Sequence, residues 1–156
     1  MTVNSIPSPP EGQDLAQVPL KFEVTRIPVT DFDQAKAFYR RLGWQLDIDF
    51  QFTEHVRAVQ FTPPGSAASI HFGPPAGPPL EGLLLIVDDI ETAHAEIQNR
   101  GIEISDIFHS LPGGEPAPGR NPQGRSYVSQ AAFSDPDGNT WVLQEVTERI
   151  PGRITY

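Results

Sequence analysis

The chain contains no cysteine. This absence excludes disulfides, thiolate zinc sites and cysteine nucleophiles, and it is typical of a protein kept in a reducing cytoplasm, where we expect this one. No apolar run approaches the roughly 20 residues that span a bilayer, so we expect no membrane partner. The first residues have neither a basic start nor an apolar stretch, which argues against a signal peptide. A Ser/His/Asp arrangement, a phosphate-binding glycine loop and a dinucleotide fingerprint are all missing.

Positive charge is also scarce. The chain has 11 Lys and Arg residues against 20 Asp and Glu, which gives a formal net charge of −9. An acidic surface repels a phosphate backbone, so nucleic acid is not an expected partner. The same charge favours a cationic small molecule, although its simpler interpretation is solubility. With 38% hydrophobic residues, the composition is that of an ordinary globular protein.

One segment of the sequence occurs twice. VTDFDQAKAFYRRLG (residues 29–43) aligns without a gap with VDDIETAHAEIQNRG (residues 87–101). Each copy has an acidic residue suited to cap a helix, then apolar residues at helical spacing, then a glycine that can end the helix. An internal repeat of this kind predicts two copies of one structural unit. The identical pairs are Val29/Val87, Asp31/Asp89, Ala35/Ala93, Ala37/Ala95 and Gly43/Gly101.

Strand patterns surround each predicted helix. Strict alternation of apolar and polar residues over 44–52 predicts a strand with one buried face. Residues 110–124 form a long loop without a regular pattern. The other predicted strands are 21–29, 56–61 and 69–73 in the first copy, and 83–87, 102–108, 126–133 and 139–146 in the second, with a tight turn at 135–138.

These elements predict an α+β fold of two tandem βαβββ modules. The expected divisions are a flexible N-terminal arm (residues 1–19), module one (20–76), module two (80–148) and a C-terminal tail (149–156). The first helix is expected to be capped by Thr30 or Asp31.

Two motifs resemble the vicinal oxygen chelate superfamily, which includes glyoxalases, bleomycin-resistance proteins and extradiol dioxygenases. PVTDFDQAKAFYRRLGW (residues 28–44) is similar to the family's first strand-to-helix segment, and FSDPDGNTWVLQE (133–145) to its closing turn and strand. The resemblance covers about residues 20–148. It implies that each module curls its strands into half of a cup, with the site inside. The resemblance leaves the function open, because one fold hosts many chemistries.

The resemblance also places four metal-ligand positions, on the first and last strands of each module. They fall on Val24, His71, Gly82 and Val142, and only His71 carries a donor. A divalent ion needs three or four converging donors, so we expect the usual metal site to be absent, with His71 the only metal ligand if there is one. This interpretation depends on strand register, because a slip of one residue exchanges the faces; if Glu23 faced the cup, a metal site would be favoured again.

Several side chains are candidates for the cup. His71 has the chemistry of a base, and Arg26 that of a stabiliser for a carbonyl or anionic oxygen, so these two are the candidate catalytic residues. Each also has a purely structural interpretation, as an ordinary hydrogen-bonded histidine and a salt bridge at the cup rim. The candidate ligand-binding residues are Val24, Gln144, Val142, Gly82, Tyr127 and His109.

Three functions remain open at this point. The first is metal-independent binding of a small organic molecule, in the manner of bleomycin-resistance proteins and in a homodimer. The second is a lyase, isomerase or dioxygenase with Mg, Mn, Fe, Ni or Zn held by His71, Gln144 and a loop residue. The third is a metal-free enzyme with His71 as base and Arg26 as stabiliser of an oxyanion.

Overall fold

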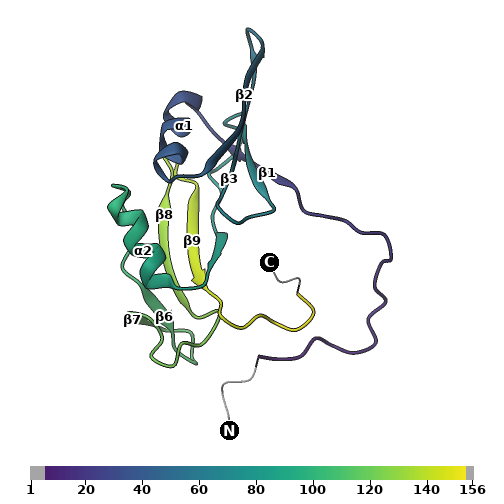
Figure 1. The fold of residues 1–156 in the computed structure, drawn as a ribbon, viewed down its shortest axis with the longest axis vertical. Coiled ribbons are helices and arrows are strands. Elements are labelled where there is room, and N and C mark those ends of the chain that lie inside the picture. The colour runs from purple at the N-terminus through teal and green to yellow at the C-terminus, as the bar shows by residue number, and fades with distance from the viewer. Residues whose placement is uncertain (1–5, 154–156) are drawn as a thin grey trace.

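The computed structural model describes residues 6–153, which form two packed modules with a sheet and a helix in each (Figure 1). Among the described residues, neither helix is long and apolar enough to cross a membrane. Module one contains β1 (Val24–Pro28), α1 (Phe32–Arg41), β2 (Gln45–Thr53), β3 (Val56–Thr62) and β4 (Ser69–Gly73). Module two contains β5 (Leu83–Val87), α2 (Ile90–Asn99), β6 (Phe108–Ser110), β7 (Pro116–Pro118), β8 (Ser129–Ser134) and β9 (Thr140–Glu145).

The two sheets share one topology. The order is β1-β4-β3-β2 in module one and β5-β9-β8-β6-β7 in module two, so β7 is an addition at one edge. In each sheet the strand before the helix pairs in parallel with the last strand of the module, and the other pairs are antiparallel. The predicted α+β fold with two βαβββ modules is confirmed.

The helices begin and end where the repeated segments predict. Asp31 accepts a hydrogen bond from the backbone N–H of Gln34, and Asp89 accepts one from that of Thr92. These bonds satisfy N–H groups that the first helical turn leaves free. Of the two expected caps for the first helix, the structure therefore selects Asp31. Gly43 and Gly101 both follow their helices with a φ of 80°, a conformation that other residues rarely adopt.

The hydrophobic core lies between the modules. Tyr39 of α1 is fully buried, and its ring contacts Trp44, Phe61 and Phe72 of its own module. The ring of Trp44 also meets that of Trp141 on β9 edge-on, with centroids 4.9 Å apart. Because aromatic side chains of both modules fill one core, the modules hold each other in place.

A buried polar cluster in the Asp-Pro-Asp-Gly turn after β8 joins the modules. The Asp135 carboxylate accepts hydrogen bonds from the Tyr39 hydroxyl (2.8 Å) and the Asn139 side-chain amide (2.9 Å). Trp141 Nε1 donates to the Tyr39 hydroxyl (3.0 Å), and Asn139 also donates to the Pro28 carbonyl (2.9 Å). Burial, followed by the negative charge of Asp135, raises the pKa of Tyr39, so the phenol stays a neutral donor.

The alternating segment 44–52 does not have the single buried face that its pattern predicts. Leu46 pairs with Phe61, but the register then shifts and Ile48 pairs with Gln60. This bulge turns the following apolar residues to the opposite face of the sheet. Phe50 is 54% exposed and Phe52 59% exposed, on a hairpin that extends beyond the body of the molecule (Figure 1).

The bulge brings Asp49 against two cations. Arg57 donates to the Asp49 carboxylate through Nε (2.8 Å) and Nη2 (2.9 Å), and Lys36 of α1 donates to it at 2.7 Å. The hydrogen bonds from Arg57, then those from Lys36, hold the pKa of Asp49 well below its ordinary value.

Replacing Asp49 with asparagine is expected to lower the free energy of unfolding by about 1 to 2 kcal/mol at neutral pH. The lowered pKa stabilises the folded state fully above the ordinary carboxyl value, about pH 4, and the stabilisation is lost as the pH falls towards the folded value. The difference between the two proteins should therefore shrink in acid. Urea unfolding at several pH values measures it, and a difference that stays constant would contradict the prediction.

Module two departs from its predicted strands in three places. The predicted strand 102–108 is confined to Phe108–Ser110, while Ile102 and Ile104 cover the core outside any strand. The predicted irregular loop 110–124 contains β7, which pairs with β6. After this loop, residues 126–127 form a turn, so β8 begins at Ser129 rather than near residue 126.

The predicted arm and tail are partly described. Residues 6–19 contain no helix or strand, and in Figure 1 this segment leaves β1 and runs clear of the modules. Residues 1–5 of the predicted arm and residues 154–156 of the predicted tail lie outside the described part of the chain.

Candidate functional site

One row of side chains crosses the face of the module-one sheet that points away from the core. Arg26 of β1 pairs with His71 of β4, His71 pairs with Gln60 of β3, and Gln60 pairs with Ile48 of β2. Partners in register share a face, and Ile27, next to Arg26, is fully buried on the other side. We call the outward faces of the two sheets the cup faces.

His71 stands at the centre of this row. Its side chain is half-buried, and its Nδ1 atom is buried without a hydrogen-bond partner among the described residues. Buried polar atoms are nearly always paired, so an orphan atom on this face indicates a place for a ligand group or water. Arg26 is exposed beside it, and the two predicted catalytic residues are therefore neighbours on adjacent strands.

A carboxylate that the sequence analysis missed completes the polar part of this face. Asp47, in the bulge of β2, accepts hydrogen bonds from Thr62, Gln60 and Gln45. Burial raises the pKa of Asp47, but the hydrogen bonds from Thr62, Gln60 and Gln45 outweigh it and lower the pKa overall. Asp47 therefore remains negative and fixes the side chain of Gln60 next to His71. Only the bulge places it here, and the plain alternation of the segment gives no sign of that bulge.

The cup face of module two is mainly apolar. Leu84 of β5 pairs with Val142 of β9, and Ile86 pairs with Gln144. Trp141 and Leu143 are buried on the other side, so Val142 and Gln144 face the cup as predicted. The Gln144 side-chain amide is not free, because it donates to the backbone carbonyl of Tyr127 at 3.1 Å.

The four positions at which the resemblance implies metal ligands do not suit a metal. Val24, Gly82 and Val142 have no donor in their side chains, and the register leaves Val24 with His71 on one cup face and Val142 on the other. Gly82 has a φ of 72°, so a ligating side chain at this position would strain the backbone. Glu23 precedes Val24 and by alternation belongs to the opposite face. Within residues 6–153, no three His, Asp or Glu side chains are grouped to hold an ion.

His109 does not lie in the cup. It pairs with Ser129, which is fully buried, whereas its neighbour Phe108 pairs with Gln130 on the cup face. Its side chain is buried and its Nδ1 atom is 2.7 Å from the Gly119 carbonyl oxygen. The candidate ligand-binding residue His109 is therefore placed by the β6–β7 hairpin with its side chain buried on the face away from the cup.

Tyr127 has a structural role. It has a φ of 71°, the single positive value among the described residues other than glycine. Its backbone N–H donates to the Glu145 carbonyl, its carbonyl accepts from Gln144, and its hydroxyl accepts from the backbone N–H of Ile150. These three bonds hold a strained residue in place and tie the C-terminal tail to the end of β9.

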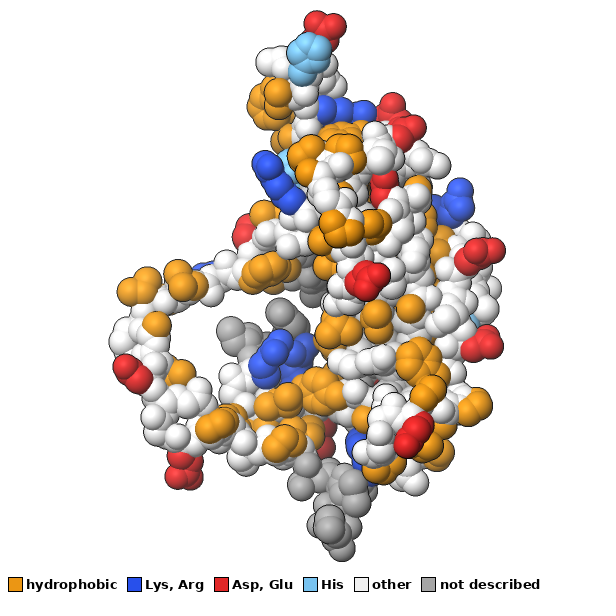
Figure 2. All heavy atoms as spheres, turned by 180° about the vertical axis from the view of Figure 1, so that it is seen from behind, with side chains coloured by type: hydrophobic (Ala, Val, Ile, Leu, Met, Phe, Trp, Pro, Cys, Tyr) orange, Lys and Arg blue, Asp and Glu red, His pale blue; other side chains and the backbone are white. Residues whose placement is uncertain are grey.

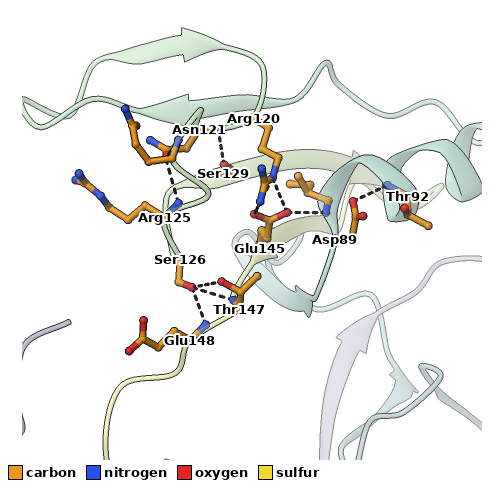
Figure 3. A network of polar contacts seen from close by, with 12 residues as sticks. Asp89, Thr92, Arg120, Asn121, Arg125, Ser126, Ser129, Glu145, Thr147 and Glu148 are labelled. Carbon is orange, nitrogen blue, oxygen red and sulfur yellow. Dashed lines mark hydrogen bonds and ion pairs between the residues drawn. The ribbon is translucent and has the colours of Figure 1, made fainter. Parts of the chain in front are cut away.

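A polar network at the same end of β9 fixes the loop before Tyr127 (Figure 3). Glu145 is 1% exposed and accepts from Arg120 Nε (3.0 Å) and from the first backbone N–H of α2, that of Ile90 (3.0 Å). The hydrogen bond and charge of Glu145 raise the pKa of Arg120 further. Ser126 accepts from the backbone N–H groups of Thr147 and Glu148. This network is structural, since the charges of Arg120 and Glu145 at its centre already pair with each other.

Comparisons with known proteins agree with this architecture. Residues 21–143 match the Glyoxalase/Bleomycin resistance protein/Dioxygenase superfamily. The crystal structure of TnmS3, an antibiotic binding protein from Streptomyces sp. CB03234, is 33% identical over 83% of this chain and 98% of that one, with a TM-score of 0.62. A glyoxalase/bleomycin resistance protein from the same organism is 35% identical over 80% of this chain and 99% of that one, with a TM-score of 0.58.

A third similar structure, a superfamily member from Sphaerobacter thermophilus DSM 20745, is 27% identical over 81% of this chain and 98% of that one, with a TM-score of 0.61. A search of curated protein sequences finds no match. The family match extends over most of the chain, and the topology of the two sheets agrees with it. The chain therefore belongs to the Glyoxalase/Bleomycin resistance protein/Dioxygenase superfamily.

Proposed function

We propose that this protein binds a small organic molecule of the antibiotic type on its cup faces, without the metal that resemblance to the family's metal-using members implies. The main support for the proposal is the set of residues at the four expected metal-ligand positions. Three of them hold Val24, Gly82 and Val142, so a single donor, His71, remains where three or four must converge. Residues without a donor at these positions favour contact with an organic ligand over coordination of an ion.

The character of the cup faces supports the same function. Leu84 is 55% exposed and Ile86 39% exposed on one face, while Arg26, His71 and Gln60 form a polar row on the other. Small-molecule sites typically combine apolar walls with a few fixed polar groups. The similarity to a protein described as antibiotic-binding points to the same class of ligand.

The proposal includes a homodimer. Phe50, Phe52 and Leu84 are each more than half exposed in a single copy, and the first two project on the hairpin beyond the body. Large exposed apolar surfaces of this kind usually mark an interface or a ligand site. A second copy placed over the cup faces would cover these side chains and enclose the ligand.

Calorimetric titration of the purified protein with metal-free bleomycin tests the binding function. We expect saturable binding with one ligand per cup, unchanged after treatment with a chelator. Metal analysis of the same sample should find no stoichiometric ion. An essential ion, or binding abolished by chelation, would refute metal independence. If bleomycin and a panel of aromatic antibiotics all fail to bind, the assigned ligand class is wrong.

The orphan Nδ1 atom of His71 favours a second candidate, metal-free catalysis with His71 as base and Arg26 as stabiliser of an oxyanion. The two functions differ in whether the bound molecule is changed. Incubating the protein with bleomycin or with the glutathione hemithioacetal of methylglyoxal, and analysing the products by mass spectrometry, separates them. Turnover that His71→Ala abolishes would establish catalysis, and recovery of unchanged molecules would exclude it for these probes.

A further inference from the structure

The side-chain amide of Gln60, on β3, has an orientation that its hydrogen bonds fix. Its Nε2 atom donates to a carboxylate oxygen of Asp47 at 3.1 Å. Asp47 remains negative, so both of its oxygens can only accept hydrogen bonds. The two ends of an amide differ, since the nitrogen donates and the carbonyl oxygen accepts. The nitrogen of Gln60 must therefore face Asp47, because the reversed amide would place two acceptors against each other.

Further hydrogen bonds hold the Asp47 carboxylate in place. The Thr62 hydroxyl donates to the same oxygen as Gln60, and Gln45 donates to the other oxygen. Thr62 has a single hydroxyl hydrogen, which this bond uses, so the contact between the Thr62 and Ser69 hydroxyls (2.6 Å) takes its hydrogen from Ser69. The hydrogen bonds therefore run in one direction, from the buried Ser69 through Thr62 to Asp47. They fix the carboxylate oxygen to which Gln60 is bound.

The carbonyl oxygen of Gln60 is the end of the amide that remains for a ligand. Gln60 pairs with His71 on the neighbouring strand, and both side chains lie on the cup face of module one. The Nδ1 atom of His71 has no hydrogen-bond partner among the described residues, so it does not donate to the Gln60 oxygen. Because Asp47 holds the nitrogen end, the half-buried Gln60 side chain offers the cup an acceptor and not a donor.

The row from Arg26 through His71 to Gln60 therefore has different chemistry at its two ends. The Arg26 guanidinium can only donate hydrogen bonds, whereas the carbonyl oxygen of Gln60 can only accept them. The two residues are two strand spacings apart, which is about 10 Å. Beyond Gln60 the row continues with Ile48, which is 39% exposed. Figure 2 shows hydrophobic side chains along the β2–β3 hairpin and around its base, so apolar surface adjoins the acceptor end.

From this arrangement we infer that Asp47 is a positioning residue that, through Gln60, makes the cup selective for molecules with a hydroxyl or N–H group about 10 Å from an anionic or carbonyl oxygen. The inference rests on the binding function proposed above and specifies its ligand class. The oxygen of the ligand accepts from Arg26, and its hydroxyl or N–H donates to the carbonyl oxygen of Gln60. A molecule with an ether in place of the hydroxyl leaves that oxygen facing a group that cannot donate, and is therefore rejected.

Two rigid probes that differ by one methyl group test this selectivity. 6-Hydroxy-2-naphthoate carries a carboxylate and a hydroxyl at opposite ends of two fused rings, and 6-methoxy-2-naphthoate has a methyl ether in place of the hydroxyl. Titration followed by the fluorescence of the naphthalene ring gives the dissociation constant of each. We expect the hydroxyl probe to bind about 10-fold more tightly, the value of one hydrogen bond. Equal affinities, tighter binding of the ether, or no binding of either probe overturns the inference.

Substitutions at both residues test whether the orientation of the amide is the cause. Gln60→Met removes the amide at similar volume, and Asp47→Ala releases it, so in each the preference for the hydroxyl probe should fall below about 3-fold. Asp47→Asn retains an oxygen that accepts from Gln60 and Thr62, with its nitrogen turned towards Gln45, and should keep a preference of at least about 5-fold. The ratio compares two probes on one protein, so a general loss of stability cancels. A full preference in Gln60→Met would contradict the inference.

Gln45→Met is the matched control, because Gln45 also donates to Asp47 but is exposed and does not pair with His71. Its preference for the hydroxyl probe should stay near about 10-fold. An equal loss in Gln45→Met and Gln60→Met would show that the amide of Gln60 has no special role, and would overturn the inference. Bleomycin titration separates this failure from that of the proposed function. Bleomycin binding without discrimination between the naphthoates refutes the inference alone, whereas failure of bleomycin and the antibiotic panel refutes the assigned ligand class as well.

Discussion

Replacing Asp135 with alanine is expected to lower the free energy of unfolding by about 3 to 5 kcal/mol, the largest effect we expect from any single substitution outside the aromatic core. The Asp135 carboxylate is 5% exposed, and it accepts from the Tyr39 hydroxyl, the Asn139 amide and the backbone N–H groups of Asp137 and Asn139. Alanine leaves these donors without an acceptor in a place that water does not reach. Because the donors come from both modules, the variant should also loosen the contact between them.

Urea unfolding followed by tryptophan fluorescence measures this effect, since Trp141 donates to Tyr39 in the same cluster. Tyr39→Phe removes one hydroxyl and retains the ring, so about 1 to 3 kcal/mol is expected. Asp137→Ala is the matched control: its carboxylate accepts from Thr30 near the surface, and its removal should cost less than about 1 kcal/mol. If Asp135→Ala is no more destabilising than Asp137→Ala, the cluster does not join the modules as described.

The sequence carried enough information to predict the fold because its signals are local. The caps at Asp31 and Asp89 and the glycines at the ends of the helices act within one turn of chain. The cup-facing register of β9 also follows from local alternation, since Trp141 and Leu143 are large and apolar while Gln144 is not. Each of these features needs no knowledge of distant residues.

The features that were not predicted depend on pairing between strands. The bulge at Asp47 changes which face Ile48 occupies, and nothing in the alternating segment itself distinguishes a bulged strand from a regular one. His109 is buried because a hairpin forms in a segment rich in proline and glycine, which has no strand pattern. In both cases the partner strand decides the position of the side chain.

The residues of the candidate site likewise fall into two groups, those that the sequence predicts and those whose place depends on strand pairing. His71 was identified from the metal position that the resemblance implies, and Arg26 from its residue type and expected strand face; the register of β1 with β4 makes them neighbours. Gln60 and Asp47 were missed, although they complete the row, because their place follows from the antiparallel pairing of β3 with β4 and from the bulge. A site built across four strands is visible in sequence only where each strand contributes an unusual residue.

His71→Ala is expected to weaken bleomycin binding about 10- to 100-fold, the value of one or two hydrogen bonds to a partly buried polar group. The Nδ1 atom of His71 is buried and has no hydrogen-bond partner within residues 6–153, while Arg26 and Gln60 flank it in the row. A ligand oxygen or N–H that meets this atom would gain a bond for which no protein group competes. Calorimetric titration measures the loss, and His71→Gln should recover part of it by retaining a donor and an acceptor.

The matched control for this prediction is His55→Ala, at the exposed tip of the β2–β3 hairpin, where the same change should leave affinity within about 2-fold. Unfolding midpoints of both variants show whether a loss of affinity reflects damage to the fold. Removing His71 leaves the apolar residues of the second cup face in place, so some binding should remain. Unchanged affinity in His71→Ala would mean that ligand contacts lie on Leu84 and Ile86 of β5, and that the orphan atom of His71 is satisfied by water.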